Sequence, residues 1–155
     1  MFDLILETPI GNLGIACEGE KLKTIRYLEQ KIVPLPNTKQ SMSLRKIAKE
    51  LDAFFVHPTC LKNIAIFLSG TPFQKKVWQA LRQIPLGQTC TYGELALKLN
   101  TSARAVGMAC RANPIALVVP CHRVVAANDI GGFCGQTKGN KIAIKQWLLA
   151  HEKAG

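Results

Sequence analysis

Two short helical segments around a three-residue break constrain the fold of this chain more than any other feature. Residues 92–98 have the composition of a short helix, and residues 99–101 (Leu-Asn-Thr) interrupt it. Ser102 can cap a second helix that runs to about Ala112, where an Asn-Pro pair stops it because the residue before proline avoids helical geometry. Two helices joined in this way indicate a helix-turn-helix unit.

A longer helix precedes this unit. Residues 71–74 (Thr-Pro-Phe-Gln) have the pattern of a capping box with proline at the first helical position. The apolar positions that follow step by three or four and predict one buried face, formed by Phe73, Val77, Leu81 and Ile84.

The N-terminal part has a different pattern. Strand-like runs at residues 2–8, 13–17 and 22–28 are separated by turn residues, which predicts a small antiparallel meander. A helix follows, because five apolar residues recur at helical spacing: Leu44, Ile47, Leu51, Phe54 and Phe55. Residues 64–68 can form an extended run before the Ser-Gly pair at 69–70. We therefore expect an α+β protein with a sheet domain at residues 1–69 and a mainly helical domain at 70–155.

The chain is basic and rich in cysteine. Twenty Lys and Arg against ten Asp and Glu give a net charge of +10, which fits either a nucleic-acid partner or a solvated basic surface. Six cysteines show no short metal-ligand spacing, which argues against a zinc ribbon. Because no apolar run is long enough for a membrane span and the first residues do not form a secretion signal, we expect a cytoplasmic protein without a membrane partner.

The run Pro-Cys-His-Arg at residues 120–123 is the candidate for chemistry. Pro120 stiffens the backbone before the sulfur of Cys121, while the imidazole of His122 and the guanidinium of Arg123 can favour the thiolate that acts as a nucleophile. The alternative is that Cys121 is a small buried hydrophobic residue.

The helix at residues 103–111 is unusual because its side chains are mostly small. It carries few groups that read base edges in the major groove, but Arg104 and Arg111 project from nearly the same side. Small side chains would let it approach the minor groove closely, and the alternative is tight packing inside the core.

The last helix carries a carboxylate on its apolar stripe. Ile144, Leu148 and Glu152 step by four, while Lys141, Lys145 and Gln146 fall elsewhere on the helical wheel. A buried Glu152 needs a partner, and His122 fits this role because a carboxylate raises the basicity of an imidazole. A frayed, solvated terminus is the alternative.

Taken together, these residues resemble the O6-alkylguanine-DNA alkyltransferase family, also called methylated-DNA–protein-cysteine methyltransferases. The matching segments occur in order over the last half of the chain: 70–74 (GTPFQ), 91–96 (TYGELA), 104–107 (RAVG), 111–114 (RANP), 120–125 (PCHRVV) and 148–152 (LLAHE). The resemblance implies a ribonuclease-H-like first domain and a winged-helix-like second domain with the helix-turn-helix.

The resemblance also implies direct reversal of DNA damage. An alkyl group would move from O6 of guanine to Cys121 in one irreversible, cofactor-free step, with O4 of thymine as a second candidate substrate. His122 would draw the thiol proton through a water, because adjacent side chains in an extended segment point in opposite directions, and Glu152 would orient His122. The partner would be double-stranded DNA containing O6-alkylguanine, bound by a monomer.

Further roles follow from the same resemblance. Arg104 would fill the place of a flipped base, Tyr92 would assist its rotation, and Arg111 would meet the DNA backbone. Asn113 would fasten the turn before the active-site segment. The remaining residues expected to line or support the pocket are Pro120, Val124, Phe133 and Cys134.

Two features depart from the family pattern. The family often has tyrosine at the position of Phe133, where a hydroxyl can donate to the departing guanine O6, and Phe133 cannot donate. Backbone donors near Cys134 could replace it, or transfer is slower. The stretch 135–140 is also a few residues longer than usual.

Three other functions compete with this interpretation. A non-catalytic module that binds alkyl lesions and recruits repair factors would lack the nucleophile, whereas Cys121 is present. A cysteine-histidine hydrolase would need an oxyanion-hole motif, which is not visible around the thiol. A helix-turn-helix regulator would need more base-reading side chains on its second helix.

Overall fold

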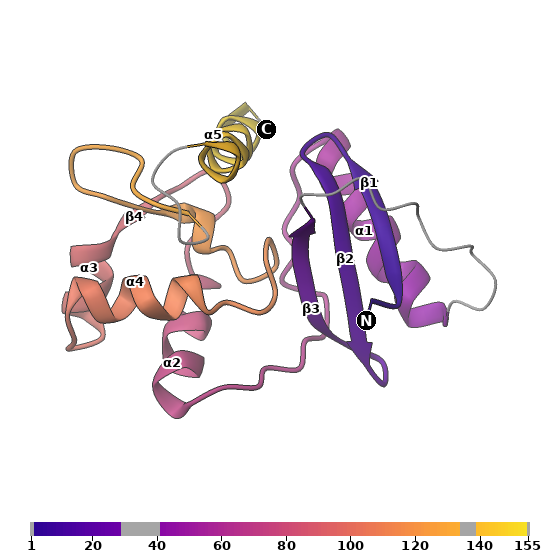
Figure 1. Cartoon of the computed structure of the whole chain (residues 1–155), viewed down its shortest axis with the longest axis horizontal. Helices are drawn as coiled ribbons and strands as arrows, with labels where there is room; N and C mark the ends of the chain where they lie inside the picture. The colour runs from indigo at the N-terminus through magenta and orange to yellow at the C-terminus, as the bar shows by residue number, and fades with distance from the viewer. Residues whose placement is uncertain (1, 29–40, 134–138, 155) are drawn as a thin grey trace. The chain divides into compact units, whose positions relative to one another are not determined.

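The computed structural model describes residues 2–28, 41–133 and 139–154 and confirms the α+β class. The elements are, in chain order, β1 (Leu4–Thr8), β2 (Gly11–Glu18), β3 (Lys21–Leu28), α1 (Met42–Val56), α2 (Pro72–Leu81), β4 (Cys90–Thr91), α3 (Tyr92–Lys98), α4 (Ala103–Arg111), the 3-10 turn η1 (Cys121–Arg123), β5 (Val124–Val125) and α5 (Asn140–Ala154) (Figure 1). Among the described helices, none is long and apolar enough to cross a membrane.

The chain divides into two compact units. One, which we call the sheet unit, contains Met1–Ser69 and Pro114–Val118, and the other, the helical unit, contains Gly70–Asn113 and Val119–Gly155. The sequence places a domain boundary between residues 69 and 70, and its patterns do not anticipate that Pro114–Val118 joins the sheet unit.

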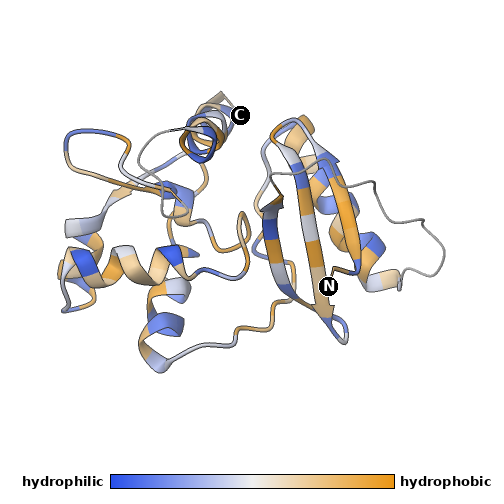
Figure 2. Cartoon of the chain, in the orientation of Figure 1, coloured by the Kyte–Doolittle hydropathy of each residue, from blue (hydrophilic) through white to orange (hydrophobic). Residues whose placement is uncertain are grey.

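The predicted antiparallel meander is confirmed. Strands β1, β2 and β3 pair in that order, with Leu4 opposite Ile15 and Ile15 opposite Ile25. Leu13 and Ile15 are two residues apart on β2, so they share one face of the sheet, and both are fully buried. In Figure 2, β1 is mostly in the hydrophobic colour, whereas hydrophobic and hydrophilic bands alternate along β3.

Helix α1 packs in the sheet unit as its spacing predicts. Ser41 caps it by accepting a hydrogen bond from the Leu44 N–H, and all five predicted apolar positions are buried. The expected extended run at 64–68 forms only one parallel bridge, between Ile66 and Leu22. The same strand β3 pairs through Ile25 with Ile115, so two separate segments satisfy its backbone groups.

Helix α2 begins with the predicted capping box, in which the Thr71 and Gln74 side chains each accept from the other residue's backbone N–H. Val77 and Leu81 are buried as expected. The prediction for Phe73 is wrong, because its side chain is 38% exposed in the first helical turn. Trp78 is buried instead, and its indole N–H donates to the Ala109 carbonyl oxygen at 2.8 Å, which joins α2 to α4.

The helix-turn-helix segments have the bounds that the sequence predicts, and α3 and α4 lie side by side (Figure 1). Thr91 forms a second capping box with Glu94, and Ser102 caps α4 by accepting from the Ala105 N–H. Asn100, in the break, has φ 55°, a left-handed conformation that asparagine tolerates better than most residues.

Candidate active site

Two tight turns precede Cys121 and position it in the site. Leu117 has φ 71°, and the Val118 N–H donates to the Ala116 carbonyl at 2.9 Å across it, which makes a strained γ-turn. Pro120 has φ −82° and ψ 67°, and the Cys121 N–H donates to the Val119 carbonyl at 2.8 Å, which makes an inverse γ-turn. Proline suits this second turn because its ring restricts φ to this region.

Asn113 holds the second turn and also touches the sulfur. Its Nδ2 donates to the Val119 carbonyl at 2.8 Å and lies 3.2 Å from Cys121 Sγ. The first contact agrees with the fastening role that the resemblance implies, and the second was not predicted. A donor directed at sulfur stabilises a thiolate more than a neutral thiol, because hydrogen bonds to a charged acceptor are stronger.

The extended conformation expected around Cys121 is wrong. Cys121–Arg123 form the 3-10 turn η1, and strand structure begins only at Val124. About three residues complete such a turn, so neighbouring side chains are about 120° apart instead of opposite. The water relay between Cys121 and His122 thereby loses its support from extended geometry and stays a prediction of the resemblance.

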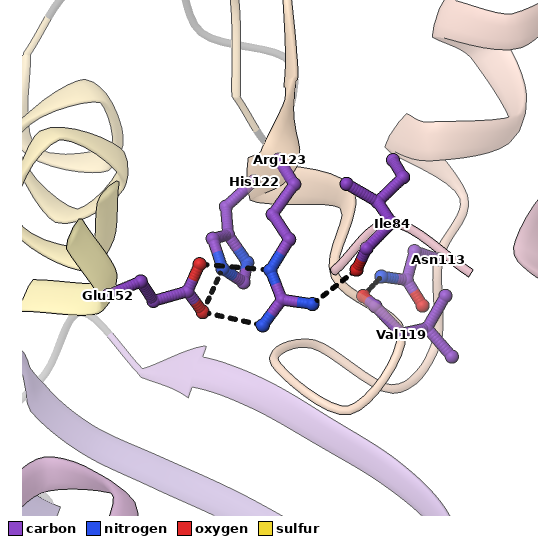
Figure 3. Close-up of polar contacts among 6 residues, drawn as sticks. All are labelled: Ile84, Asn113, Val119, His122, Arg123 and Glu152. Carbon is purple, nitrogen blue, oxygen red and sulfur yellow. Dashed lines mark hydrogen bonds and ion pairs between the residues drawn. The ribbon is translucent and has the colours of Figure 1, made fainter. Parts of the chain in front are cut away.

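His122 and Arg123 both reach Glu152 on α5 (Figure 3). His122 Nε2 lies 2.9 Å from Glu152 Oε2, as the apolar stripe of the last helix predicts. Arg123 donates from Nε to Oε1 at 2.9 Å, from Nη2 to Oε2 at 2.8 Å, and from Nη1 to the Ile84 carbonyl at 2.9 Å. All three side chains are buried, so the cluster is a hydrogen-bonded network in a site of low dielectric.

The charges in this cluster determine the tautomer of His122. Burial opposes ionisation of Glu152, but hydrogen bonds from His122 and Arg123 and their charges outweigh it and lower the pKa of the carboxyl to about 2. An ionised carboxylate only accepts hydrogen bonds, so His122 Nε2 carries a proton. Burial lowers the pKa of His122, against the opposing influence of Glu152 and helped by the charges of Arg123 and Lys145. The ring is therefore neutral at pH 7, and its lone pair is on Nδ1.

Nδ1 of His122 is available for proton transfer. It is buried and has no hydrogen-bond partner among the residues that the structure describes. A neutral imidazole held through one nitrogen by a carboxylate, with the other nitrogen unprotonated, is the arrangement of a general base. The sequence predicts this pairing of His122 with Glu152, but it does not predict Arg123 as the second partner of the carboxylate.

Lys145 is the site residue that sequence reasoning missed. The predicted apolar stripe of α5 excludes it, yet it is fully buried. Its Nζ donates to the carbonyls of Val124 at 2.7 Å and Gly132 at 2.9 Å. The signal is present in the sequence, because Lys145 lies three residues before Leu148 and seven before Glu152, which is the spacing of one helix face.

Tyr92 lies beside this lysine. Its hydroxyl donates to the Gly132 carbonyl at 3.3 Å, and the Lys145 ammonium is 5.8 Å from the centre of its ring. Burial, with the nearby sulfurs of Cys110 and Cys121, raises the pKa of Tyr92 to about 12, so the phenol keeps its proton. The Gly132 carbonyl thus accepts hydrogen bonds from both Tyr92 and Lys145, and Gly132 directly precedes Phe133 in the chain.

The other predicted residues fall into three settings. Val124, in β5, and Phe133 are buried, and β5 pairs in parallel with β4. Arg104 and Arg111 are exposed on α4, whose buried face is formed by Val106 and Ala109. Cys134 and most of the longer 135–140 loop lie outside the described residues.

The described part of the chain contains no disulfide bond at its five cysteines, Cys17, Cys60, Cys90, Cys110 and Cys121. Within residues 2–28, 41–133 and 139–154, no group of three or more His, Cys, Asp or Glu side chains is arranged to hold a metal ion.

Comparison with known proteins gives consistent results. A family model described as "6-O-methylguanine DNA methyltransferase, DNA binding domain" matches residues 72–154. The methylated-DNA–protein-cysteine methyltransferase of Methanosarcina acetivorans is 38% identical over 98% of both chains, and that of Haemophilus influenzae is 35% identical over 94% of this chain and 83% of its own.

Solved structures agree with these sequence matches. The crystal structure of the Mycobacterium tuberculosis O6-methylguanine methyltransferase has a TM-score of 0.81 and 38% identity, and covers 97% of this chain and 91% of its own. A structure of M. tuberculosis OGT in complex with DNA has a TM-score of 0.80 and 37% identity over the same shares.

Proposed function

The chain belongs to the methylated-DNA–protein-cysteine methyltransferase family and acts in repair of alkylated DNA, and from this premise we propose that Cys121 accepts the alkyl group from O6 of guanine. In this reaction the thiolate sulfur attacks the alkyl carbon, a new S–C bond forms, and the bond between that carbon and guanine O6 breaks with its electrons on the departing guanine. The soft thiolate suits attack on a saturated carbon.

The strongest support for this function is the 2.9 Å hydrogen bond between His122 and Glu152. It fixes the imidazole with a proton on Nε2 and a lone pair on Nδ1, next in sequence to the thiol. His122 then takes the thiol proton at Nδ1, through a water, and the resulting imidazolium is stabilised by the ionised Glu152. Asn113 Nδ2, 3.2 Å from Sγ, holds the sulfur and stabilises its negative charge.

The product is a thioether, which the neighbouring groups do not hydrolyse. Each protein molecule therefore acts once, and the amount of repaired DNA equals the amount of modified protein. The alkylated base reaches the buried sulfur by leaving the base stack. Arg104 fills its place, Tyr92 assists its rotation and Arg111 contacts phosphate, with both arginines exposed on α4 as this role requires.

The substrate is O6-alkylguanine in double-stranded DNA, and O4-alkylthymine is the second candidate. DNA as the partner is supported by the match to the DNA-binding domain of the family. Phe133 borders the pocket without a hydroxyl, and Val124, Pro120 and Cys134 keep their expected supporting roles. A monomeric state and cytoplasmic location stay predictions of the sequence.

The test is incubation of the protein with duplex DNA containing O6-methylguanine, followed by mass measurement of the intact protein and its peptides. One added methyl group on Cys121, and none in the Cys121→Ala variant, supports the proposal. An unmodified protein that binds the lesion tightly would instead favour the recruiting module, and modification of another cysteine would reassign the acceptor.

A further inference from the structure

The outward face of α4 combines two arginines with one glycine and one large apolar side chain. The helical repeat of 3.6 residues places four residues opposite the buried Val106 and Ala109, namely Arg104, Gly107, Met108 and Arg111. Met108 lies one turn from each arginine, so it is the apolar centre of a basic helix face.

Gly107 has no evident role inside the protein. A Cβ atom at this position would meet no described atom within 4 Å, and the backbone is helical. Glycine inside a helix costs about 1 kcal/mol relative to alanine. The space beside Gly107 is open, and the missing side chain leaves room for a partner to approach the helix backbone next to Met108.

Met108 is 67% exposed. Single exposed apolar residues are common on protein surfaces, so this exposure alone indicates nothing. The residues around Met108 are more informative than its exposure. The arginines on either side attract phosphate, Gly107 leaves clearance beside it, and the flexible thioether adapts to an irregular apolar surface. A duplex groove that is anionic at its rim and partly apolar at its floor matches this arrangement.

We propose that Met108 is a DNA-positioning residue whose side chain inserts into the minor groove and packs against sugars and base edges beside the lesion. Proteins that bind the minor groove often use apolar side chains, methionine included, in this way. The contact is independent of base sequence, as a repair protein requires. This role rests on the proposed function, because it assigns a further contact to the same protein–DNA complex.

The first test compares the affinity of full-length variants for an unmodified duplex over a range of salt concentrations. Met108→Ala should bind roughly tenfold more weakly, because apolar contact area is lost. The slope of log K against log salt should not change. Arg111→Gln should instead make this slope shallower by about 0.9, the value for one released counterion. Met42→Ala is the matched control, because Met42 is 86% exposed on α1, and its affinity should equal that of the wild type.

The second test separates the DNA contact from the chemistry. Methyl transfer is timed from an O6-methylguanine duplex and from the free O6-methylguanine base, which lacks the groove that the proposed Met108 contact requires. In Met108→Ala the ratio of the duplex rate to the free-base rate should fall roughly tenfold, in line with the affinity.

An unchanged affinity, a changed salt slope, or an equal loss with both substrates would overturn the role of Met108. If the wild-type protein gains no methyl group from either substrate, the proposed function fails. The affinity comparison still decides whether Met108 contacts DNA.

Discussion

Arg123 holds both carboxylate oxygens of Glu152, with Nε 2.9 Å from Oε1 and Nη2 2.8 Å from Oε2 (Figure 3). His122 shares Oε2 at 2.9 Å. A planar guanidinium that binds both oxygens fixes the carboxylate plane more firmly than one imidazole contact can. Glu152 is therefore oriented by Arg123, and His122 is oriented by Glu152.

Replacement of Glu152 by glutamine should both destabilise the protein and slow alkyl transfer. The guanidinium of Arg123 would remain buried without its counter-charge, and such a loss costs about 3 to 5 kcal/mol of unfolding free energy. Chemical denaturation and the rate of methyl transfer measure the two effects. Glu18→Gln is the control, because Glu18 forms an exposed ion pair with Lys23 and its loss should cost at most about 1 kcal/mol. Equal stability of the two variants would contradict the network.

The same cluster predicts how stability depends on pH. The pKa of Glu152 is lowered to about 2, so its contribution is complete above the unfolded value of about 4.3 and is lost as pH falls towards 2. The pKa of His122 is also lowered, so the unfolded chain takes up its proton first and stability begins to fall as pH drops below about 6.5.

Denaturant unfolding between pH 3 and 8 measures this profile. We expect a plateau above pH 6.5 and two successive declines below it. The first decline should disappear in His122→Gln, which cannot take up a proton. A free energy of unfolding that increases as the pH is lowered from 6.5 to 5 would contradict a buried, neutral His122.

Asn113→Ala should reduce the reactivity of the thiol without unfolding the protein. It removes Nδ2, the nitrogen that donates to the Val119 carbonyl and lies beside Cys121 Sγ. Alkylation of Cys121 by iodoacetamide at pH 7 should slow about tenfold, since hydrogen bonds to charged groups contribute about 1.5 to 3 kcal/mol. Asn100→Ala, in the break between α3 and α4, controls for a general effect on stability. If alkylation keeps its wild-type rate, the contact with sulfur has no chemical role.

Local capping signals explain why the starts of α2 and α4 could be predicted, and α3 carries a signal of the same kind. Thr71, Thr91 and Ser102 each bond to a backbone N–H three residues later, so the start of each helix is encoded within four residues. The 3-10 turn at Cys121–Arg123 has no such signal. It follows from contacts with α5 about 30 residues away and from the pairing of β4 with β5, which sequence periodicity does not report.

The site could also be predicted only where its residues follow a local spacing pattern. Helical spacing places Glu152 on the buried face of α5, and a buried carboxylate needs a partner. The burial of Lys145 contradicts the ordinary preference of lysine for water, and its hydrogen bonds to the carbonyls of Val124 and Gly132 help to offset the cost. The packing of Pro114–Val118 with the sheet unit is likewise a long-range pairing, made through Ile25.

Lys145→Met should destabilise the helical unit by about 2 to 4 kcal/mol, because two carbonyl oxygens lose a charged donor. Methionine has a similar length and keeps most of the apolar packing. The thermal midpoint and the transfer rate should both fall, since Gly132 directly precedes Phe133, which the proposed function places at the pocket. Lys75→Met, at an exposed position of α2, should leave both unchanged. If Lys145→Met matches this control, the two hydrogen bonds do not stabilise the site.

Phe133→Tyr should accelerate alkyl transfer. The added hydroxyl can donate to guanine O6 as negative charge develops there, and such a bond is worth about 1.5 to 3 kcal/mol, or roughly ten- to a hundredfold in rate. Phe133 is buried, so a hydroxyl without a partner in the free protein should lower its stability by about 1 to 3 kcal/mol. Single-turnover transfer from an O6-methylguanine duplex, measured beside the melting temperature, distinguishes the two effects. A faster but less stable variant means that the position faces the leaving base. A variant that is less stable and no faster would mean that other donors in the pocket stabilise the departing guanine.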